Sequence, residues 1–132
     1  FPLASFTSTG TTVDLTKINH NQRIVESGSN ENGNWTKFAD GTMICFNTRH
    51  MGSACKSSLG PTFTTSPEQW IFPEAFILTP SVNLFVIDGV PYSFASMGNN
   101  GANQVQCTFI VSAFMLNETK PVVSMSAFGR WK

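Results

Sequence analysis

The chain has 132 residues, which is enough for one domain with its own hydrophobic core and little more. Only 12% of the residues are charged, and the eight basic and eight acidic side chains cancel. This balance argues against nucleic acid as a partner and against an anionic membrane surface, because both reward a basic face. A hydrophobic fraction of 41% excludes a disordered chain. No apolar run approaches the roughly 20 residues that span a bilayer.

Neutral polar residues replace the missing charge. The sequence holds 14 Ser, 14 Thr and 11 Asn, together 39 of 132 residues. Threonine suits strands and all three favour turns, whereas none of them is a good helix former. The composition therefore predicts a domain built mostly of β-strands.

Residues 1–21 differ from the rest of the chain. They are rich in Ser, Thr and Gly and lack a sustained hydrophobic period. This pattern predicts a linker or an extended lead-in from a region further upstream, and residues 22–132 are expected to form the folded domain. We expect the chain to be a fragment of a longer protein.

Alternation of apolar and polar residues begins near residue 22. Residues 22–27 predict a short strand, and the turn formers of 28–33 predict a loop. Two β-rich runs, 34–39 and 42–48, then flank Asp40-Gly41. A two-residue Asp-Gly between such runs predicts a hairpin, because both central positions of that turn need a positive φ.

The second half of the chain continues the same pattern. Residues 50–61 and 97–103 predict polar loops, and a second Asp-Gly at 88–89 closes a strand. Further strands are expected at residues 62–65, 69–72, 81–87, 92–95, 104–114 and 122–131. About eight strands with turn residues every 8–12 positions are typical of an antiparallel β-sandwich or barrel.

Several predicted strands carry large apolar residues on both faces. Phe85 and Ile87 lie opposite the apolar face of their strand, and Ile110 and Phe114 do the same in theirs. A two-layer sandwich needs only one apolar face per strand, so the second face predicts another cover, most simply a neighbouring copy of the chain. Scattered exposed apolar residues are the alternative. The pattern does not fix the number of copies.

The residues that carry chemistry are few. Acidic residues show no paired spacing, and His50 is the one histidine placed to act as a base. The three cysteines have no CxxC spacing: Cys45 and Cys107 fall in apolar runs, and Cys55 falls in a loop where it could react. We therefore expect no enzymatic activity, no cofactor and no metal, with reduced thiols typical of assembly in a cytoplasm.

The polar loops favour binding instead. Amide and hydroxyl groups match the donors and acceptors of sugar hydroxyls, and an aromatic ring can stack on an apolar sugar face. The alternative is that Asn and Gly are simply turn formers. The candidate receptor-binding residues are Asn30, Asn32, Arg49, His50, Lys56, Tyr92, Asn99, Asn100 and Asn103.

Three segments resemble a known family. Residues 24–45 (IVESGSNENGNWTKFADGTMIC) are similar to the opening of the C-terminal domains in tail fibres of tailed bacteriophages and prophages. Two weaker pieces agree in order: WIFPEAF at 70–76 followed by TPSV at 79–82, and the terminal AFGRWK at 127–132. Together they cover the chain from about residue 24 to its end.

The resemblance implies a β-sandwich similar to the H-type lectins, assembled as a homotrimer at the tip of a fibre in the virion after synthesis in the host cytoplasm. It implies a receptor-binding role toward lipopolysaccharide, capsule or an outer-membrane protein, with residues 1–21 continuing an upstream shaft. It carries no catalytic residue. If strands alternate up and down from that shaft, the loops at 28–33 and 50–61 are expected at the distal end.

Two other functions compete with receptor binding. A structural trimerisation cap would close the fibre and bind nothing. A glycan-cleaving enzyme would need a pair of Asp or Glu carboxyl groups about 5–10 Å apart in a groove.

Overall fold

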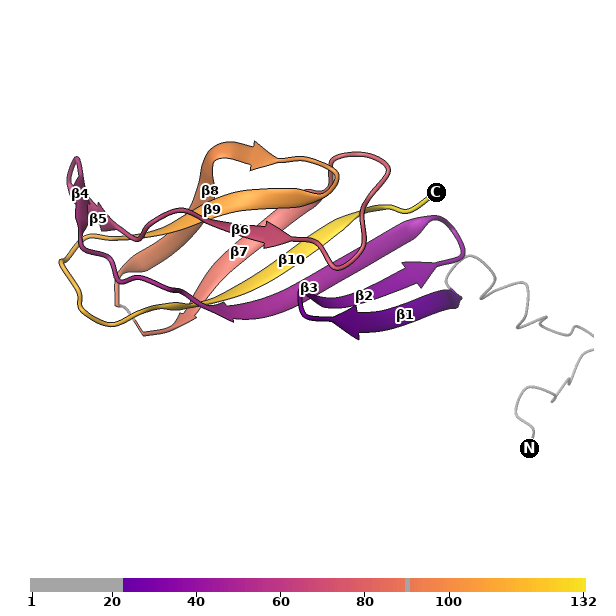
Figure 1. Ribbon diagram of the computed structural model, residues 1–132, viewed down its shortest axis with the longest axis horizontal. Helices are drawn as coiled ribbons and strands as arrows, with labels where there is room; N and C mark the ends of the chain where they lie inside the picture. Colours follow the sequence, from indigo (N-terminus) through magenta and orange to yellow (C-terminus); the bar gives the residue numbers. More distant parts are fainter. Residues whose placement is uncertain (1–22, 90) are drawn as a thin grey trace, which may run out of the picture.

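The protein is described by a computed structural model that covers residues 23–89 and 91–132. The lead-in predicted for residues 1–21 lies outside these residues and stays a prediction. Every regular element within the described ranges is a β-strand (Figure 1). The strands are β1 (Ile24–Asn30), β2 (Gly33–Phe38), β3 (Thr42–His50), β4 (Ser57–Leu59), β5 (Thr62–Thr64), β6 (Glu68–Ile71), β7 (Ser81–Asp88), β8 (Ser93–Ala102), β9 (Gln106–Ala113) and β10 (Val122–Arg130).

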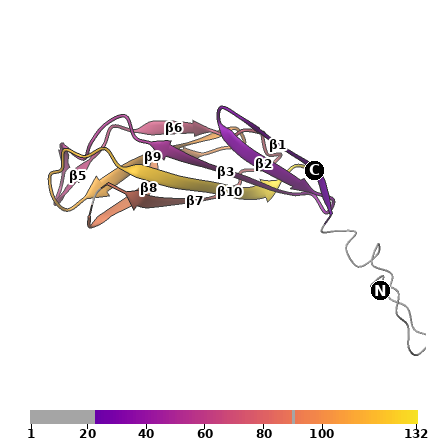
Figure 2. The ribbon, with the colours of Figure 1, turned by 90° about the horizontal axis from the view of Figure 1, so that it is seen from below.

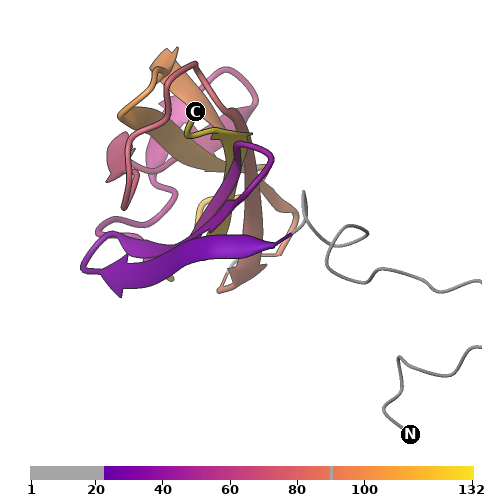
Figure 3. The same ribbon diagram turned by 90° about the vertical axis from the view of Figure 1, so that its right-hand side faces the viewer.

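The strands form two antiparallel sheets, so the predicted all-β antiparallel sandwich is confirmed. Sheet A has the order β1-β2-β3-β10-β7. In sheet B, β9 is central: β5 and β6 pair with one edge of it, β8 pairs with the other edge, and β4 extends the sheet beyond β5. Figures 2 and 3 show the two layers from the side and from one end.

The core lies between the two sheets and follows the period of two in the sequence. In β9 the inward side chains Cys107, Phe109 and Val111 are fully buried, and Val123 and Ala127 of β10 face them from sheet A. Trp70 also lies fully buried, with its ring edge-on to Phe72 at 5.0 Å between centroids. Apolar burial between the sheets is the main stabilising contribution to a fold of this kind.

The Asp40-Gly41 hairpin is confirmed. Gly41 has a φ of 97°, and the Thr42 N–H donates to the Asp40 carboxylate over 2.8 Å. This hydrogen bond to the charged form lowers the pKa of Asp40 below its usual value. The predicted two-residue turn is wrong, because β2 ends at Phe38 and β3 begins at Thr42, which leaves three residues in the loop. The Gly41 N–H donates to the Phe38 carbonyl over 3.0 Å, and only Gly41 of the Asp-Gly pair has a positive φ.

The second Asp-Gly has a different role. β7 pairs with β10 in sheet A, whereas β8 pairs with β9 in sheet B. Asp88 and Gly89 therefore begin a crossover from one layer to the other. Gly89 has a positive φ of 102°, as expected for glycine in a turn. The strand after this turn, β8, does not pair with β7, the strand before it.

Three predicted loops are shorter than expected. β1 continues to Asn30, which leaves a two-residue turn at residues 31–32, and Ser57–Leu59 forms a strand inside the expected loop 50–61. β8 runs through the expected loop 97–103 as far as Ala102, with an irregular register between Met97 and Ala102. These polar segments lack an apolar period, but their backbone groups still pair with a neighbouring strand.

The three cysteines are buried with free thiols, including Cys55, whose predicted loop position left it able to react. Burial raises the pKa of Cys45 and of Cys107 to about 11, and it also raises the pKa of Cys55. Because the thiolate is the reactive form, we expect none of the three to react with a disulfide reagent within minutes at pH 8 in the native protein. All three should react in urea. If the native chain reacted within minutes and released the thiolate leaving group of the reagent, this result would contradict the burial of the thiols.

Candidate functional site

The described chain begins and ends at the same end of the sandwich. The Ala39 N–H donates to the Arg23 carbonyl over 2.8 Å, and the Trp131 indole donates to the Phe38 carbonyl over 2.8 Å. Arg23 and Trp131 therefore flank the same hairpin. The opposite end, called here the far end, is formed by the β3–β4, β4–β5, β7–β8 and β9–β10 connections (Figure 1).

The far end exposes many large apolar side chains. Phe114, Met115 and Leu116 are three consecutive examples in the β9–β10 connection. The Phe114 ring lies 6.0 Å from that of Phe94 at the start of β8. Apolar surface gathered in this way marks an interaction site more often than isolated exposed residues do.

Tyr92 is the most exposed of these residues, at 76% of its full surface. Its φ of 55° places it in the left-handed region, which is uncommon for any residue except glycine. A non-glycine residue held in this region stores backbone strain, and such strain is found most often at binding and catalytic sites. The position of Tyr92 at the far end fits the binding role predicted for it.

A hollow opens on the outer face of sheet B near the far end. Ile110 lies at this face, because it pairs with Ser96 and alternates with the buried Phe109 and Val111. The hollow has a volume of about 250 Å³. It is called here the Ile110 hollow, and its lining residues are Leu59, Thr64, Thr65, Pro67, Met97, Gly98 and Ile110. None of them was among the predicted binding residues.

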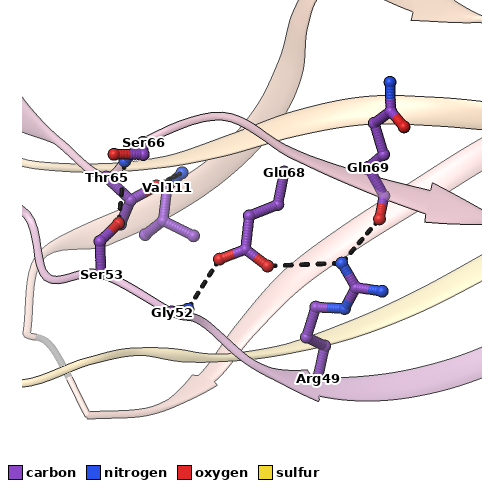
Figure 4. A network of polar contacts seen from close by, with 8 residues as sticks. All are labelled: Arg49, Gly52, Ser53, Thr65, Ser66, Glu68, Gln69 and Val111. Atoms are coloured by element: carbon purple, nitrogen blue, oxygen red, sulfur yellow. Dashed lines mark hydrogen bonds and ion pairs between the residues drawn. The ribbon is translucent and has the colours of Figure 1, made fainter.

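Arg49 lies inside β3 and not in a loop, with its side chain between the sheets. Its guanidinium donates to the Gln69 carbonyl over 2.6 Å and to a Glu68 oxygen over 3.3 Å, as Figure 4 shows. The other Glu68 oxygen accepts from the Gly52 N–H over 2.7 Å. This network ties β3 and the connection after it to β6, so the charge of Arg49 is engaged within the domain.

Two of the predicted asparagines, Asn30 and Asn103, take turn roles. The Asn30 side-chain oxygen accepts from the Asn32 N–H over 2.8 Å, and its amide nitrogen donates to the Pro73 carbonyl over 3.0 Å. The side-chain oxygen of Asn103 accepts from the Val105 and Gln106 N–H groups over 2.8 and 2.9 Å. These contacts favour the alternative that such residues are turn formers.

The nine predicted residues do not form one cluster. Lys56 and Tyr92 both lie at the far end, but at opposite edges of sheet B, next to β4 and β8. The Lys56 ammonium pairs with a Glu118 carboxylate over 2.9 Å. His50 is exposed at the last position of β3, opposite Val122. Asn99 and Asn100 belong to the irregular part of β8. The loop at 28–33 packs against residues 70–73, away from the far end that we expected it to share with 50–61.

Two carboxylates meet at Lys37. Its ammonium lies 2.6 Å from a Glu26 oxygen and 2.9 Å from a Glu74 oxygen, so the two carboxyl oxygens are at most about 5.5 Å apart. The hydrogen bond from Lys37 lowers the pKa of Glu26. A general acid needs a raised pKa, so this carboxylate pair resembles a structural ion-pair network more than a hydrolytic site.

The described residues contain no group of three His, Cys, Asp or Glu side chains that could hold a metal ion, and no helix that could cross a membrane.

Comparison with known proteins gives matches in structure only. No family model and no characterised protein matches the chain by sequence. An N-truncated R1-type pyocin tail fibre superposes with a TM-score of 0.52 at 14% identity, over 91% of this chain and 98% of that one. A C-terminal fragment of the P. aeruginosa R2 pyocin fibre gives a TM-score of 0.52 at 15% identity. A similar fragment of the R1 fibre gives 0.50 at 14%.

The matches to these two longer fragments cover 96% of this chain and 38–39% of each fibre fragment. They therefore extend over nearly the whole described sandwich and not over one hairpin of it. The chain has the antiparallel β-sandwich fold found in the R1 and R2 pyocin tail fibres, and the tail-fibre resemblance noted in its sequence is confirmed at the level of the fold.

Proposed function

We propose that this chain is the receptor-binding domain of a tail fibre from a phage or phage-like particle, and that it attaches the particle to a glycan of the bacterial surface without catalysis. The observation that carries the proposal is the fold shared with pyocin tail fibres over 91–96% of the chain. Lipopolysaccharide and capsule are the glycans in view. An outer-membrane protein is the alternative receptor.

The geometry of the sandwich supports this role. The far end lies opposite the point where the described chain begins, so an upstream shaft attached there leaves the far end free to meet a cell. The strained Tyr92 and the exposed apolar residues gather at that end. The domain would then occupy the tip of the fibre.

A homotrimer is part of the proposal, with the outer face of sheet A turned toward the threefold axis. On that face, three neighbouring sets of cross-strand paired residues carry apolar and neutral polar side chains and no charge. The first set is Thr36, Ile44, Phe128 and Ser81; the second is Asn34, Phe46, Ser126 and Asn83; the third is Thr48, Ser124 and Phe85. Phe46, Phe85 and Phe128 are 43–63% exposed in the single chain. Identical faces that meet at an axis tolerate no unpaired charge, because like charges repel.

The proposal is tested by binding of the fluorescently labelled chain to a panel of bacterial strains before and after periodate oxidation of their surface sugars. We expect at least one strain to bind, and we expect oxidation to abolish that binding. Binding that survives periodate would contradict a glycan receptor and indicate a protein. A folded chain that binds no strain would instead support the structural cap.

The same preparation tests the absence of catalysis. Incubation of the chain with purified polysaccharide from a strain that binds is expected to leave the length distribution of the polymer unchanged. Shortening of the polymer that disappears in the variant Glu74→Gln would assign the cleavage to the carboxylates at Lys37 and overturn the noncatalytic proposal.

A further inference from the structure

We propose that the Ile110 hollow is a sugar subsite that takes a neutral terminal monosaccharide carrying a methyl or N-acetyl group. This inference rests on the proposed glycan-binding function and names the class of sugar for which the site is built. The hollow lies on the outer face of sheet B, so it stays open to solvent in an assembly that buries the outer face of sheet A.

The size of the hollow limits its occupant. Sites for drug-sized ligands measure about 300–1,000 Å³, and this hollow holds about 250 Å³. It therefore fits a single terminal residue or its substituent and not a stretch of polymer. Such a small site suits a particle whose avidity comes from several weak binding sites that act at once.

The lining determines the chemistry. Leu59, Pro67, Met97 and Ile110 offer apolar surface, and no charged side chain takes part. A charged sugar acid would lose its hydration there without gaining a partner, so the ligand is neutral. A bare hexose presents hydroxyls to such a surface, whereas a methyl or acetyl methyl group gains about 4-fold in affinity when it is buried.

Thr65 supplies the polar contact. It is 2% exposed, and its hydroxyl oxygen accepts from the Val111 N–H over 3.1 Å, while its own N–H donates to the Val111 carbonyl over 2.9 Å. These two bonds fix the side chain. Within residues 23–89 and 91–132 the hydroxyl accepts this bond and donates none, so its proton is available to a carbonyl or hydroxyl oxygen of a ligand.

Gly98 keeps the wall of the hollow in place. A Cβ at this position would lie 2.8 Å from the Thr108 side chain, which is closer than real Cβ contacts come. Glycine therefore lets the irregular part of β8 approach β9. The wall that β8 contributes is then set by backbone packing, and the hollow exists before any ligand arrives.

The test is NMR titration of the full chain, with methyl resonances of Met97 and Ile110 as reporters. The probes are N-acetyl-D-glucosamine, N-acetyl-D-galactosamine, L-fucose and L-rhamnose, with D-glucose, D-galactose, L-galactose and L-mannose as their respective parent hexoses. We expect the methyl-bearing sugars to shift the Met97 and Ile110 signals with millimolar affinity and the parent hexoses to bind at least about 4-fold more weakly. Equal binding of both groups would overturn the proposed class.

Two variants locate the site. Met97→Lys places a charge in the hollow and is expected to weaken sugar binding at least 10-fold, because the ligand would have to displace its hydration. Leu78→Lys makes the same kind of change at an exposed residue outside the hollow lining and is expected to bind as the unchanged chain does. Heteronuclear NMR spectra of both variants establish that they are folded.

The outcomes separate this proposal from the function on which it rests. Periodate-sensitive cell binding that Met97→Lys leaves intact would overturn the hollow and keep the glycan receptor. Loss of sugar and cell binding in Met97→Lys but not in Leu78→Lys supports both. Cell binding that resists periodate, together with no shift from any probe, overturns both.

Discussion

Replacing Trp70 with alanine is expected to lower the free energy of unfolding by about 3–5 kcal/mol, as deletion of a fully buried aromatic side chain does. The Trp70 ring packs edge-on against Phe72, and its indole donates to the Asn32 carbonyl over 2.8 Å. The substitution thus leaves a cavity between the sheets and removes a bond that holds the β1–β2 turn against β6. Urea denaturation at a fixed protein concentration measures the loss.

Two further variants divide this effect into its parts. Trp70→Phe keeps most of the ring volume and loses the N–H donor, so a loss of about 1 kcal/mol is expected from the hydrogen bond. Leu78→Ala removes an exposed side chain and should change stability by less than about 0.5 kcal/mol. A Trp70→Ala loss of under about 1 kcal/mol would contradict the packing described here.

A glutamate at Phe85 is expected to break the proposed homotrimer and weaken cell binding by a factor of roughly 10²–10⁴, the range over which tethered sites raise avidity. Phe85 is 63% exposed in the single chain and shares the outer face of sheet A with Ser124 and Thr48. In a trimer that turns this face inward, Phe85→Glu would bring three like charges together. Light scattering reports the mass of the assembly, and labelled binding to cells reports the avidity.

Leu78→Glu is the matched control, because Leu78 is also 63% exposed but lies in the connection between β6 and β7. This variant should keep both the mass and the avidity of the unchanged chain. A Phe85→Glu chain that still scatters as a trimer would show that another surface makes the assembly. An unchanged chain that is monomeric at micromolar concentration would remove the trimer from the proposal altogether.

Local patterns in the sequence predicted most of the fold. The Asp40-Gly41 hairpin follows from two adjacent residues, and the inward face of β9 follows from the apolar residues at every second position from 107 to 113. The second Asp-Gly shows where such reasoning stops, because its turn conformation is local while the choice of partner sheet is not. Packing of distant strands decides that choice, and no short pattern encodes it.

The candidate site was harder to predict for the same reason. Arg49 looked like a loop residue, yet its partners Glu68 and Gln69 lie about twenty positions further along the chain and across the sandwich. The lining of the Ile110 hollow comes from four separate segments, each unremarkable by itself. Tyr92 was predicted because it is a bulky aromatic residue beside a loop, and its strained backbone supports that reasoning.

The position of β10 in sheet A has a consequence for how the chain folds. β10 follows every other strand of that sheet in sequence, yet it lies inside the sheet, between β3 and β7. Until β10 has been synthesised, β3 and β7 have no neighbour on those edges, and such open edges are prone to pair with other chains. Sheet A therefore closes late and through contacts of long sequence separation, so we expect the domain to fold slowly and its unfinished chain to be prone to aggregation.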